Sequence, residues 1–207
     1  MAIFGRAFAQ TINHEGHYVN DKKDRGGQTY RGISRKNFPQ WEGWEHVDEV
    51  VNSYDPSFKI TRSKNIDIEL KKNLDLHAEV VKFYEHNFWK PLHCKEMAQD
   101  VANKLFDIAV NQGLHTAGKY FQTCLNRLNN SGKHYSDIHV DGKIGPKTVT
   151  AYKRFEDTYK TSSYRSYRSN INVLVNALRA EQAERYNHIV DMDDSQEKFY
   201  YGWLNRL

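Results

Sequence analysis

One segment, residues 97–112, constrains the fold more than any other part of the sequence. Eight of its apolar residues are spaced so that they cover nearly the whole circumference of a helix: Met97, Val101, Ala102, Leu105, Phe106, Ile108, Ala109 and Val110. A helix that is apolar all round needs neighbours on every side. We therefore predict a globular, predominantly helical protein with this helix at its centre, ending at Gly113.

Other apolar stripes supply the neighbours that this central helix requires. Residues 16–32 interrupt the helical pattern, because four glycines stand there among polar residues, and they predict a loop or a short, irregular β-hairpin. The expected fold is thus all-α, with a short hairpin after the first helix. The predicted helices span residues 2–15, 66–89, 116–128, 146–159 and 171–190, followed by a last helix that contains Phe199, Trp203 and Leu204.

Composition narrows the possible partners. The 207 residues are 39% hydrophobic and 13% aromatic, which is typical of a globular chain. The net charge of +4 suits contact with an anionic polymer such as a cell wall, but it is too evenly spread to indicate a nucleic-acid-binding face. No stretch approaches the roughly 20 apolar residues of a membrane span, and the N-terminal sequence lacks the apolar core of a secretory signal. A target outside the cytoplasm would therefore require release or a dedicated export route.

Motifs for metal and cofactor chemistry are not evident. Cys94 and Cys124 fit neither a zinc site nor a disulfide framework and are expected to be reduced thiols. The ten histidines are scattered without an HExxH pattern, and no phosphate-binding GxxxxGK[ST] sequence occurs. We expect no metal and no cofactor.

Glu15 is the first candidate for catalysis. It stands three residues after Ile12, at the end of the first apolar stripe, where partial desolvation would raise the pKa of its carboxyl group and keep it protonated. A protonated carboxyl group near neutral pH can act as a general acid. The alternative is an ordinary surface glutamate at a helix end.

Further polar residues follow Glu15 in the glycine-rich stretch. Asp24 comes nine positions later and Thr29 five positions after that. A carboxylic acid, a carboxylate and a hydroxyl suit glycosidic cleavage, in which one group donates a proton and the others position water or stabilise positive charge. Asp21 is a competing candidate, although it is equally typical of a turn, and Asp24 is also explained as a hairpin charge paired with a neighbouring cation.

The stretch EGHYVNDKKDRGGQTYRGIS strongly resembles the Glu-Gly-Gly-Tyr region of the glycoside hydrolase 108 family of N-acetylmuramidases. The resemblance continues in order through FWKPL (88–92), FDIAVNQG (106–113), DGKIGPKT (141–148) and GWLNR (202–206). It implies a lysozyme-like, all-α endolysin fold and cleavage of the β-1,4 bond between N-acetylmuramic acid and N-acetylglucosamine. It also implies that the region after about residue 95 binds peptidoglycan.

The resemblance assigns roles to individual residues. The motif glutamate, which is the catalytic acid of the family, corresponds to Glu15. The Glu15, Asp24 and Thr29 spacing is similar to the Glu-x8-Asp-x5-Thr triad of phage lysozymes, one residue shorter before the threonine. His17 replaces the second glycine of the motif; it either points to solvent or changes the pH optimum or the cleft. Tyr18, the tyrosine of the motif, is a candidate for substrate binding.

Several residues outside this motif have both a functional and a structural interpretation. Asn111 and Gln112 are candidate substrate-binding amides or else complete the end of the central helix. Asp107 is expected to be a buried structural partner, because its helix neighbours are apolar. Trp89 and Trp203 either stack on sugars or belong to the core, and the DGKIGPKT stretch is a turn and helix start or a wall contact.

We divide the chain into a catalytic region, residues 1–93, and a helical region with a peptidoglycan-binding role, residues 94–207. Because no linker sequence separates the two, we expect them to pack as one unit. We also expect the protein to be a monomer. Two rival functions remain open: a lytic transglycosylase, which yields an anhydro product, and a non-catalytic wall-binding protein. The sequence is compatible with a phage lysin, a secretion-associated muramidase or an effector.

Overall fold

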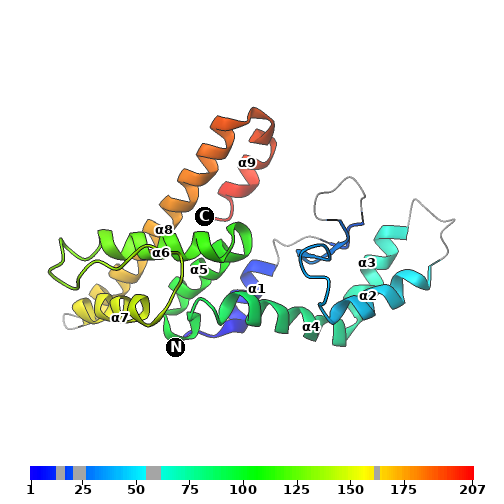
Figure 1. The fold of residues 1–207 in the computed structure, drawn as a ribbon, viewed down its shortest axis with the longest axis horizontal. Helices are drawn as coiled ribbons and strands as arrows, with labels where there is room; N and C mark the ends of the chain where they lie inside the picture. The colour runs from blue at the N-terminus through cyan, green and yellow to red at the C-terminus, as the bar shows by residue number, and fades with distance from the viewer. Residues whose placement is uncertain (13–16, 21–26, 55–61, 161–163) are drawn as a thin grey trace. The chain divides into compact units, whose positions relative to one another are not determined.

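The computed structural model describes residues 1–12, 17–20, 27–54, 62–160 and 164–207, as the ribbon in Figure 1 shows. Helices dominate, and the described sheet is one two-stranded hairpin, which confirms the predicted all-α, lysozyme-like class. The α-helices are α1 (Phe4–Ile12), α2 (Gly43–Asn52), α3 (Arg62–Lys72), α4 (Leu74–Tyr84), α5 (Gln99–Gln112), α6 (Leu114–Arg127), α7 (Pro146–Lys160), α8 (Tyr164–Met192) and α9 (Glu197–Leu204).

Shorter elements connect these helices. A π-helical turn, Glu85–Trp89, follows α4, and 3-10 turns occupy Cys94–Glu96 and Asp194–Gln196. The hairpin strands are β1 (Thr29–Tyr30) and β2 (Ile33–Ser34).

The predicted continuous helix over residues 66–89 is wrong in one respect, because the chain breaks at Asn73. The side chain of Asn73 accepts a hydrogen bond from the Leu76 backbone N–H at 2.9 Å and so caps the start of α4. An asparagine at this position satisfies one of the unpaired N–H groups of the first helical turn. The apolar pattern continues across the break, since Leu70 and Leu76 are both fully buried.

The chain divides into two compact units. The front unit comprises residues 8–87, and the back unit comprises residues 1–7 and 88–207, so the boundary falls within α1 and again after α4. The packing of the predicted regions 1–93 and 94–207 as one cooperative unit stays a prediction.

The front unit has an aromatic core formed by the segment that follows the hairpin and by helices α2 and α4. Phe83 on α4 meets Phe38 edge-on at a centroid distance of 4.7 Å and Trp41 at 6.0 Å. Trp41 in turn meets Trp44, whose indole N–H donates to the Phe38 carbonyl at 2.8 Å. Large rings in edge-to-face contact bury much apolar area in a small unit. This core fixes the helices against which the hairpin lies.

The back unit is built around α5, as the all-round apolar pattern predicts. Val101, Ala102, Leu105, Phe106, Ile108 and Ala109 have no exposed surface, and α5 contacts both α6 and α8. The Phe106 ring is met edge-on by Phe4 at 5.7 Å and by Trp89 at 6.0 Å. Trp89 is therefore part of this core, which settles its two interpretations in favour of packing.

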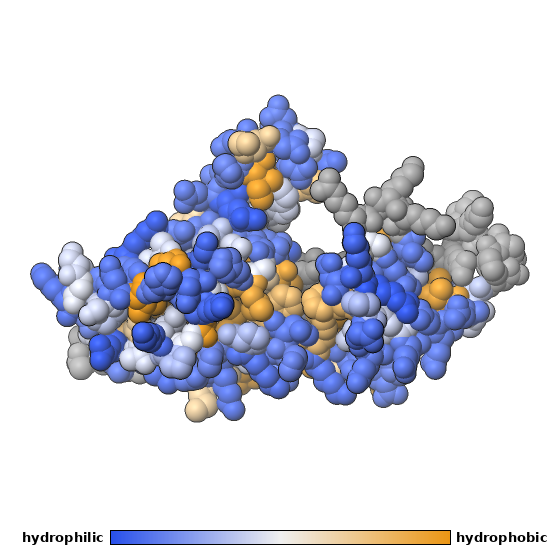
Figure 2. Space-filling view, viewed as in Figure 1, coloured by the Kyte–Doolittle hydropathy of each residue, from blue (hydrophilic) through white to orange (hydrophobic). Residues whose placement is uncertain are grey.

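The surface of the molecule is mainly polar. Hydrophilic residues cover most of the face in Figure 2, and apolar residues form only small patches among them. Among the described residues, none of the helices combines the length and the hydrophobicity needed to cross a lipid bilayer.

Candidate active site

The candidate carboxylates Glu15 and Asp24, together with Asp21, lie outside the described residues. The structure does describe what flanks them. Val19 and Thr29 form an isolated antiparallel bridge, in which each backbone N–H donates to the other's carbonyl at 2.9 and 2.8 Å. The chain segments that follow Glu15 and Asp24 are thus held side by side at this bridge.

The hairpin that carries Thr29 is set by its two-residue turn. Tyr30 pairs with Ile33 and Thr29 with Ser34, so Arg31 and Gly32 form the loop. Both loop residues have positive φ angles, 44° and 79°, as a turn that matches the twist of a short hairpin requires. The Tyr84 hydroxyl donates to the Arg31 carbonyl at 2.6 Å, which anchors the turn to α4.

Thr29 occupies the first strand of this hairpin, where its side chain is half-buried. Its hydroxyl donates to the Gly27 carbonyl at 3.2 Å. The backbone N–H and carbonyl of Thr29 both hydrogen-bond to Val19, and this bridge fixes the position of the residue. The hydrogen bond of its hydroxyl group is long for an O–H donor and holds the side chain only weakly. This description leaves the catalytic role of Thr29 a prediction.

Asp67 on α3 holds the segment that directly follows Glu15. Its Oδ1 accepts the Tyr18 backbone N–H at 3.1 Å, and its Oδ2 lies 2.7 Å from Lys71 Nζ and 3.1 Å from His17 Nδ1. Burial raises the pKa of the Asp67 carboxyl group, but the hydrogen bonds from Lys71 and Tyr18 and the positive charge of Lys71 outweigh it, so the pKa lies below its ordinary value. The carboxylate is therefore kept ionised as an anchor.

The His17 side chain points to solvent, which is one of the two orientations considered for it from the sequence. Its side chain is 73% exposed, and besides Asp67 it lies 2.9 Å from Lys71 Nζ. The imidazole therefore sits at the outer edge of this ion pair rather than in the core. The replacement of the motif glycine by histidine adds a contact to the Asp67 anchor.

Tyr18 is buried, with 5% of its surface exposed. Its hydroxyl accepts a hydrogen bond from Gln28 Nε2 at 3.2 Å, and Gln28 Oε1 accepts from Arg35 at 2.8 Å. Arg35 also forms a two-pronged pair with Asp48 at 2.6 and 2.7 Å, and the hydrogen bond from this carboxylate raises the pKa of the guanidinium. A continuous polar chain thus runs from Tyr18 to α2.

The residues Asp67, Gln28, Arg35 and Asp48 were not singled out from the sequence. Arg35 and Asp48 are 13 residues apart and belong to a loop and a helix, so no local periodicity links them. The nearest sequence signal is the excess of charge around the motif, which also fits a solvated loop. Together these contacts fix the two chain segments, residues 17–20 and 27–30, that stand on either side of Asp21 to Asp24 in the sequence.

The candidate substrate-binding amides Asn111 and Gln112 lie at the end of α5, in the back unit. Asn111 Oδ1 accepts a hydrogen bond from the Tyr186 hydroxyl on α8 at 2.9 Å. The side-chain amide atoms of Gln112 are shielded from solvent. In this structure Asn111 links α5 to α8, and the substrate-binding role of the two amides stays a prediction.

Asp107 has the structural role that its apolar neighbours suggest. Its carboxylate lies 3.4 Å from Lys104 Nζ and 3.3 Å from the Arg206 guanidinium, and its side chain is only 13% exposed. Burial lowers the pKa of Lys104, which is itself 7% exposed. Asp107 thus compensates two shielded cations and ties α5 to the end of the chain.

The stretch Asp141–Thr148 is a turn followed by the first turn of α7. Gln122 on α6 donates to Asp141 Oδ1 at 2.8 Å and accepts from the Gly142 N–H at 2.8 Å. A Cβ atom on Gly118 would lie 2.1 Å from the Gly142 carbonyl oxygen, so glycine is needed for this close approach.

Trp203 on α9 stacks on Tyr186 of α8, with their ring centroids 5.3 Å apart, within the back unit.

In the described part of the chain, no three or more His, Cys, Asp or Glu side chains are grouped so as to hold a metal ion. The thiol groups of Cys94 and Cys124 are buried, and burial raises the pKa of both, that of Cys124 to about 12. A thiol that stays protonated is a poor nucleophile and a poor metal ligand.

Comparisons with known proteins agree on the family and on the fold. The model of glycosyl hydrolase 108 matches residues 8–113, and that of the predicted peptidoglycan domain matches residues 116–207. No curated protein matches the sequence. The solved structure of Brucella abortus SagA is similar over 98% of this chain and 88% of that chain, with a TM-score of 0.52 and 23% sequence identity.

At 23% identity this likeness to a solved structure establishes the fold alone. The two family models carry more: they meet just after Gly113, so that the first includes α5 and the second begins within α6. Together they identify a glycosidase whose partner is peptidoglycan. Because the first model spans just over half of the residues and includes the motif around Glu15, the chain belongs to the glycosyl hydrolase 108 family.

Proposed function

We propose that this hydrolase is an N-acetylmuramidase, cleaving the β-1,4 bond between N-acetylmuramic acid and N-acetylglucosamine. One observation carries the proposal: the glycosyl hydrolase 108 match contains the EGHY sequence at Glu15, and a predicted peptidoglycan domain follows it directly in the same chain. A glycosidase joined to a peptidoglycan-binding region acts on the glycan strand of that polymer. Lysozyme activity is the simplest reaction of this kind.

In the proposed mechanism Glu15 protonates the oxygen of the leaving sugar. Asp24, with help from Thr29, positions the attacking water or stabilises the oxocarbenium-like transition state. The reaction needs no cofactor, because proton transfer and a carboxylate supply the chemistry. Its products are glycan fragments with a reducing N-acetylmuramic acid end.

The bridge between Val19 and Thr29 supports this pairing of carboxylates. Glu15 precedes Val19 by four residues and Asp24 precedes Thr29 by five. An extended chain spans at most about 3.5 Å per residue, so chain connectivity alone keeps the Cα atom of either residue within about 18 Å of the bridge. The Asp67 and Arg35 contacts hold these chain ends in place.

The same proposal covers where the protein works. We propose a monomer that acts on the cell wall, in the periplasm or outside the cell, after release or dedicated export. Lysis of bacteria, as an endolysin or as a secretion-associated enzyme, would follow from cleavage of many strands.

The replacement Glu15→Gln tests the assignment of the acid. The amide keeps the size of the side chain but has no proton to give, so lysis of purified cell walls should fall about 10²–10⁴-fold. Glu45→Gln is the matched control, since Glu45 is an exposed glutamate in the first turn of α2. A folded Glu15→Gln protein that clears walls at the control's rate would remove Glu15 from the mechanism.

A further inference from the structure

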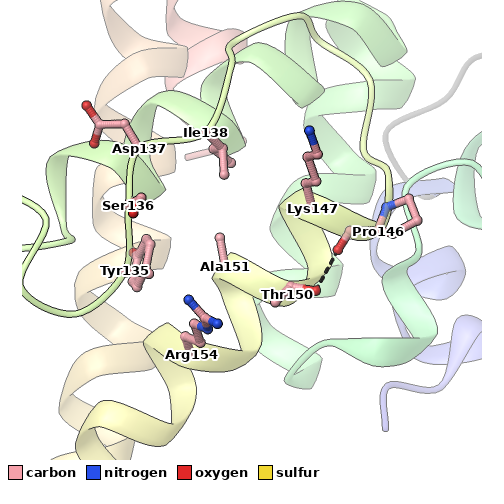
Figure 3. Close-up of a pocket in the computed structure, with 9 residues that line it drawn as sticks. All are labelled: Tyr135, Ser136, Asp137, Ile138, Pro146, Lys147, Thr150, Ala151 and Arg154. Carbon is pink, nitrogen blue, oxygen red and sulfur yellow. Dashed lines mark hydrogen bonds between the residues drawn. The ribbon is translucent and has the colours of Figure 1, made fainter.

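A pocket in the back unit lies between the 135–138 segment and α7. Its volume is about 320 Å³, which is at the small end of ligand sites in proteins. Figure 3 shows the two walls facing each other across an opening. The lining residues are Tyr135, Ser136, Asp137, Ile138, Pro146, Lys147, Thr150, Ala151 and Arg154.

The α7 wall of the pocket is cationic. Lys147 and Arg154 are seven residues apart and therefore on one face of α7, with a separation of about 10 Å along the helix axis. Both are exposed, and within the described part of the chain neither lies within ion-pair distance of a carboxylate. The two cations are thus available to an anionic ligand.

The opposite wall carries the reverse charge, and the floor is apolar. Asp137 lies on the 135–138 wall, where its carboxylate accepts a hydrogen bond from the Asn129 amide. Ala151 and Tyr135 are buried, and the Thr150 hydroxyl is turned to the Pro146 carbonyl at 2.8 Å (Figure 3). The pocket therefore offers two cations, one carboxylate and a small apolar surface.

We propose that this pocket binds the stem peptide of peptidoglycan rather than its sugars. Stem peptides are short and rich in alanine, and they carry free carboxylates and, at the diamino acid, an amino group. Three residues of extended peptide span about 10 Å, which matches the spacing of positions 147 and 154 along the axis of α7. Where the stem peptide is attached, the lactyl carboxyl group of N-acetylmuramic acid is an uncharged amide, so the sugars themselves offer no charge to pair with these three groups.

The inference rests on the proposed function, because it takes peptidoglycan as the polymer that the enzyme cleaves. It adds that two different parts of the protein recognise two different parts of the substrate. The front unit would act on the glycosidic bond, and the pocket would recognise the peptide. The pocket lies within the predicted peptidoglycan domain, residues 116–207, the part of the chain that the family comparison associates with this polymer.

A synthetic stem pentapeptide, titrated into the ¹⁵N-labelled full chain and followed by NMR, tests the proposal. Lys147→Gln combined with Arg154→Gln should raise the Kd about tenfold, because two exposed charge pairs are lost. The control, Lys119→Gln with Arg179→Gln, removes one lysine and one arginine from α6 and α8 outside the pocket and should leave the Kd unchanged.

A second variant tests the carboxylate of the opposite wall. It also provides an independent test if the double variant does not fold. Asp137→Asn keeps the acceptor for Asn129 but loses the charge, so it should weaken the peptide with a free diamino-acid amine several-fold. It should not weaken the same peptide after acetylation of that amine.

The outcomes separate this inference from the proposed function, since the pentapeptide has no glycosidic bond. Absence of peptide binding, equal Kd values for the pocket and control variants, or binding of uncharged N-acetylglucosamine oligomers to the pocket instead would overturn it. Peptide binding without any cleavage of walls would leave the inference standing and refute only the muramidase.

Discussion

Replacement of Asp67 should loosen the segment that follows Glu15, the proposed catalytic acid. Asp67→Ala removes the acceptor of the Tyr18 N–H and the partner of Lys71, whereas Asp67→Asn keeps an acceptor oxygen and removes only the charge. Both variants should destabilise the front unit, and alanine should cost more than asparagine. Because Tyr18 lies three residues after Glu15, both should also slow wall lysis.

The magnitudes follow from the two contacts. A buried N–H left without an acceptor costs about 1–3 kcal/mol, and the Tyr18 N–H has this situation in Asp67→Ala. The Lys71 pair contributes about 0.2–1 kcal/mol, since the Lys71 side chain is 40% exposed. We expect a loss in free energy of unfolding of about 2–3 kcal/mol for alanine and about 1 kcal/mol or less for asparagine.

The pH dependence gives a second check on the same residue. The pKa of Asp67 is lower in the folded chain than in the unfolded one, so its stabilising effect is present above the unfolded pKa and is lost as pH falls through the folded pKa. The wild-type advantage over Asp67→Asn should therefore be constant near neutrality and shrink below about pH 4.

Urea unfolding of both variants between pH 3 and pH 7, followed by circular dichroism, measures these differences. Glu69→Gln is the control for loss of a surface ion pair, since Glu69 lies on the same helix and its side chain, 44% exposed, pairs with Lys72. Equal stability of Asp67→Ala and Asp67→Asn, or an advantage over Asp67→Asn that grows in acid, would refute the role of Asp67 as a charged anchor.

Three further predictions concern other parts of the chain. Asp107→Ala should destabilise the back unit by about 3–5 kcal/mol in thermal unfolding, because Lys104 and Arg206 lose their shared carboxylate, while the exposed Asp100→Ala should change little; equal effects would contradict the network. Cys94 and Cys124 should not react with Ellman's reagent until the chain unfolds, and rapid labelling of the folded protein would show that they are accessible. Asp24→Asn should slow turnover strongly without weakening wall binding in a sedimentation assay, and Thr29→Ala should cost less; the reverse order would exchange their roles.

The helical part of the fold was predictable because it depends on local patterns. The apolar circumference of residues 97–112 and the long stripe over 171–190 correspond to α5 and α8, since packing requires those residues to be buried. The glycine-rich stretch predicted a loop or a short hairpin, and a hairpin lies at its end, with strands Thr29–Tyr30 and Ile33–Ser34. Its turn, however, has Arg31 at positive φ, where Asn or Asp is the usual residue, so the strand ends were not readable.

The scaffold of the candidate site was not predictable, because it depends on residues far apart in the chain. Asp67 meets Tyr18 across 49 residues, and Tyr186 meets Asn111 across 75. Each pair joins polar residues that are individually ordinary in a surface helix. Only the fold brings them together, whereas Glu15 and Asp24 are candidates proposed from a motif that is contiguous in sequence.

The most direct test of the central claim is mass spectrometry of the glycan fragments that the wild-type protein releases from purified peptidoglycan, after borohydride reduction of their ends. An N-acetylmuramidase leaves N-acetylmuramic acid at the new reducing end, so every new end should carry reduced N-acetylmuramic acid. New ends that carry 1,6-anhydro-N-acetylmuramic acid would contradict hydrolysis and indicate a lytic transglycosylase, and reduced N-acetylglucosamine ends would place the cleavage at the other glycosidic bond.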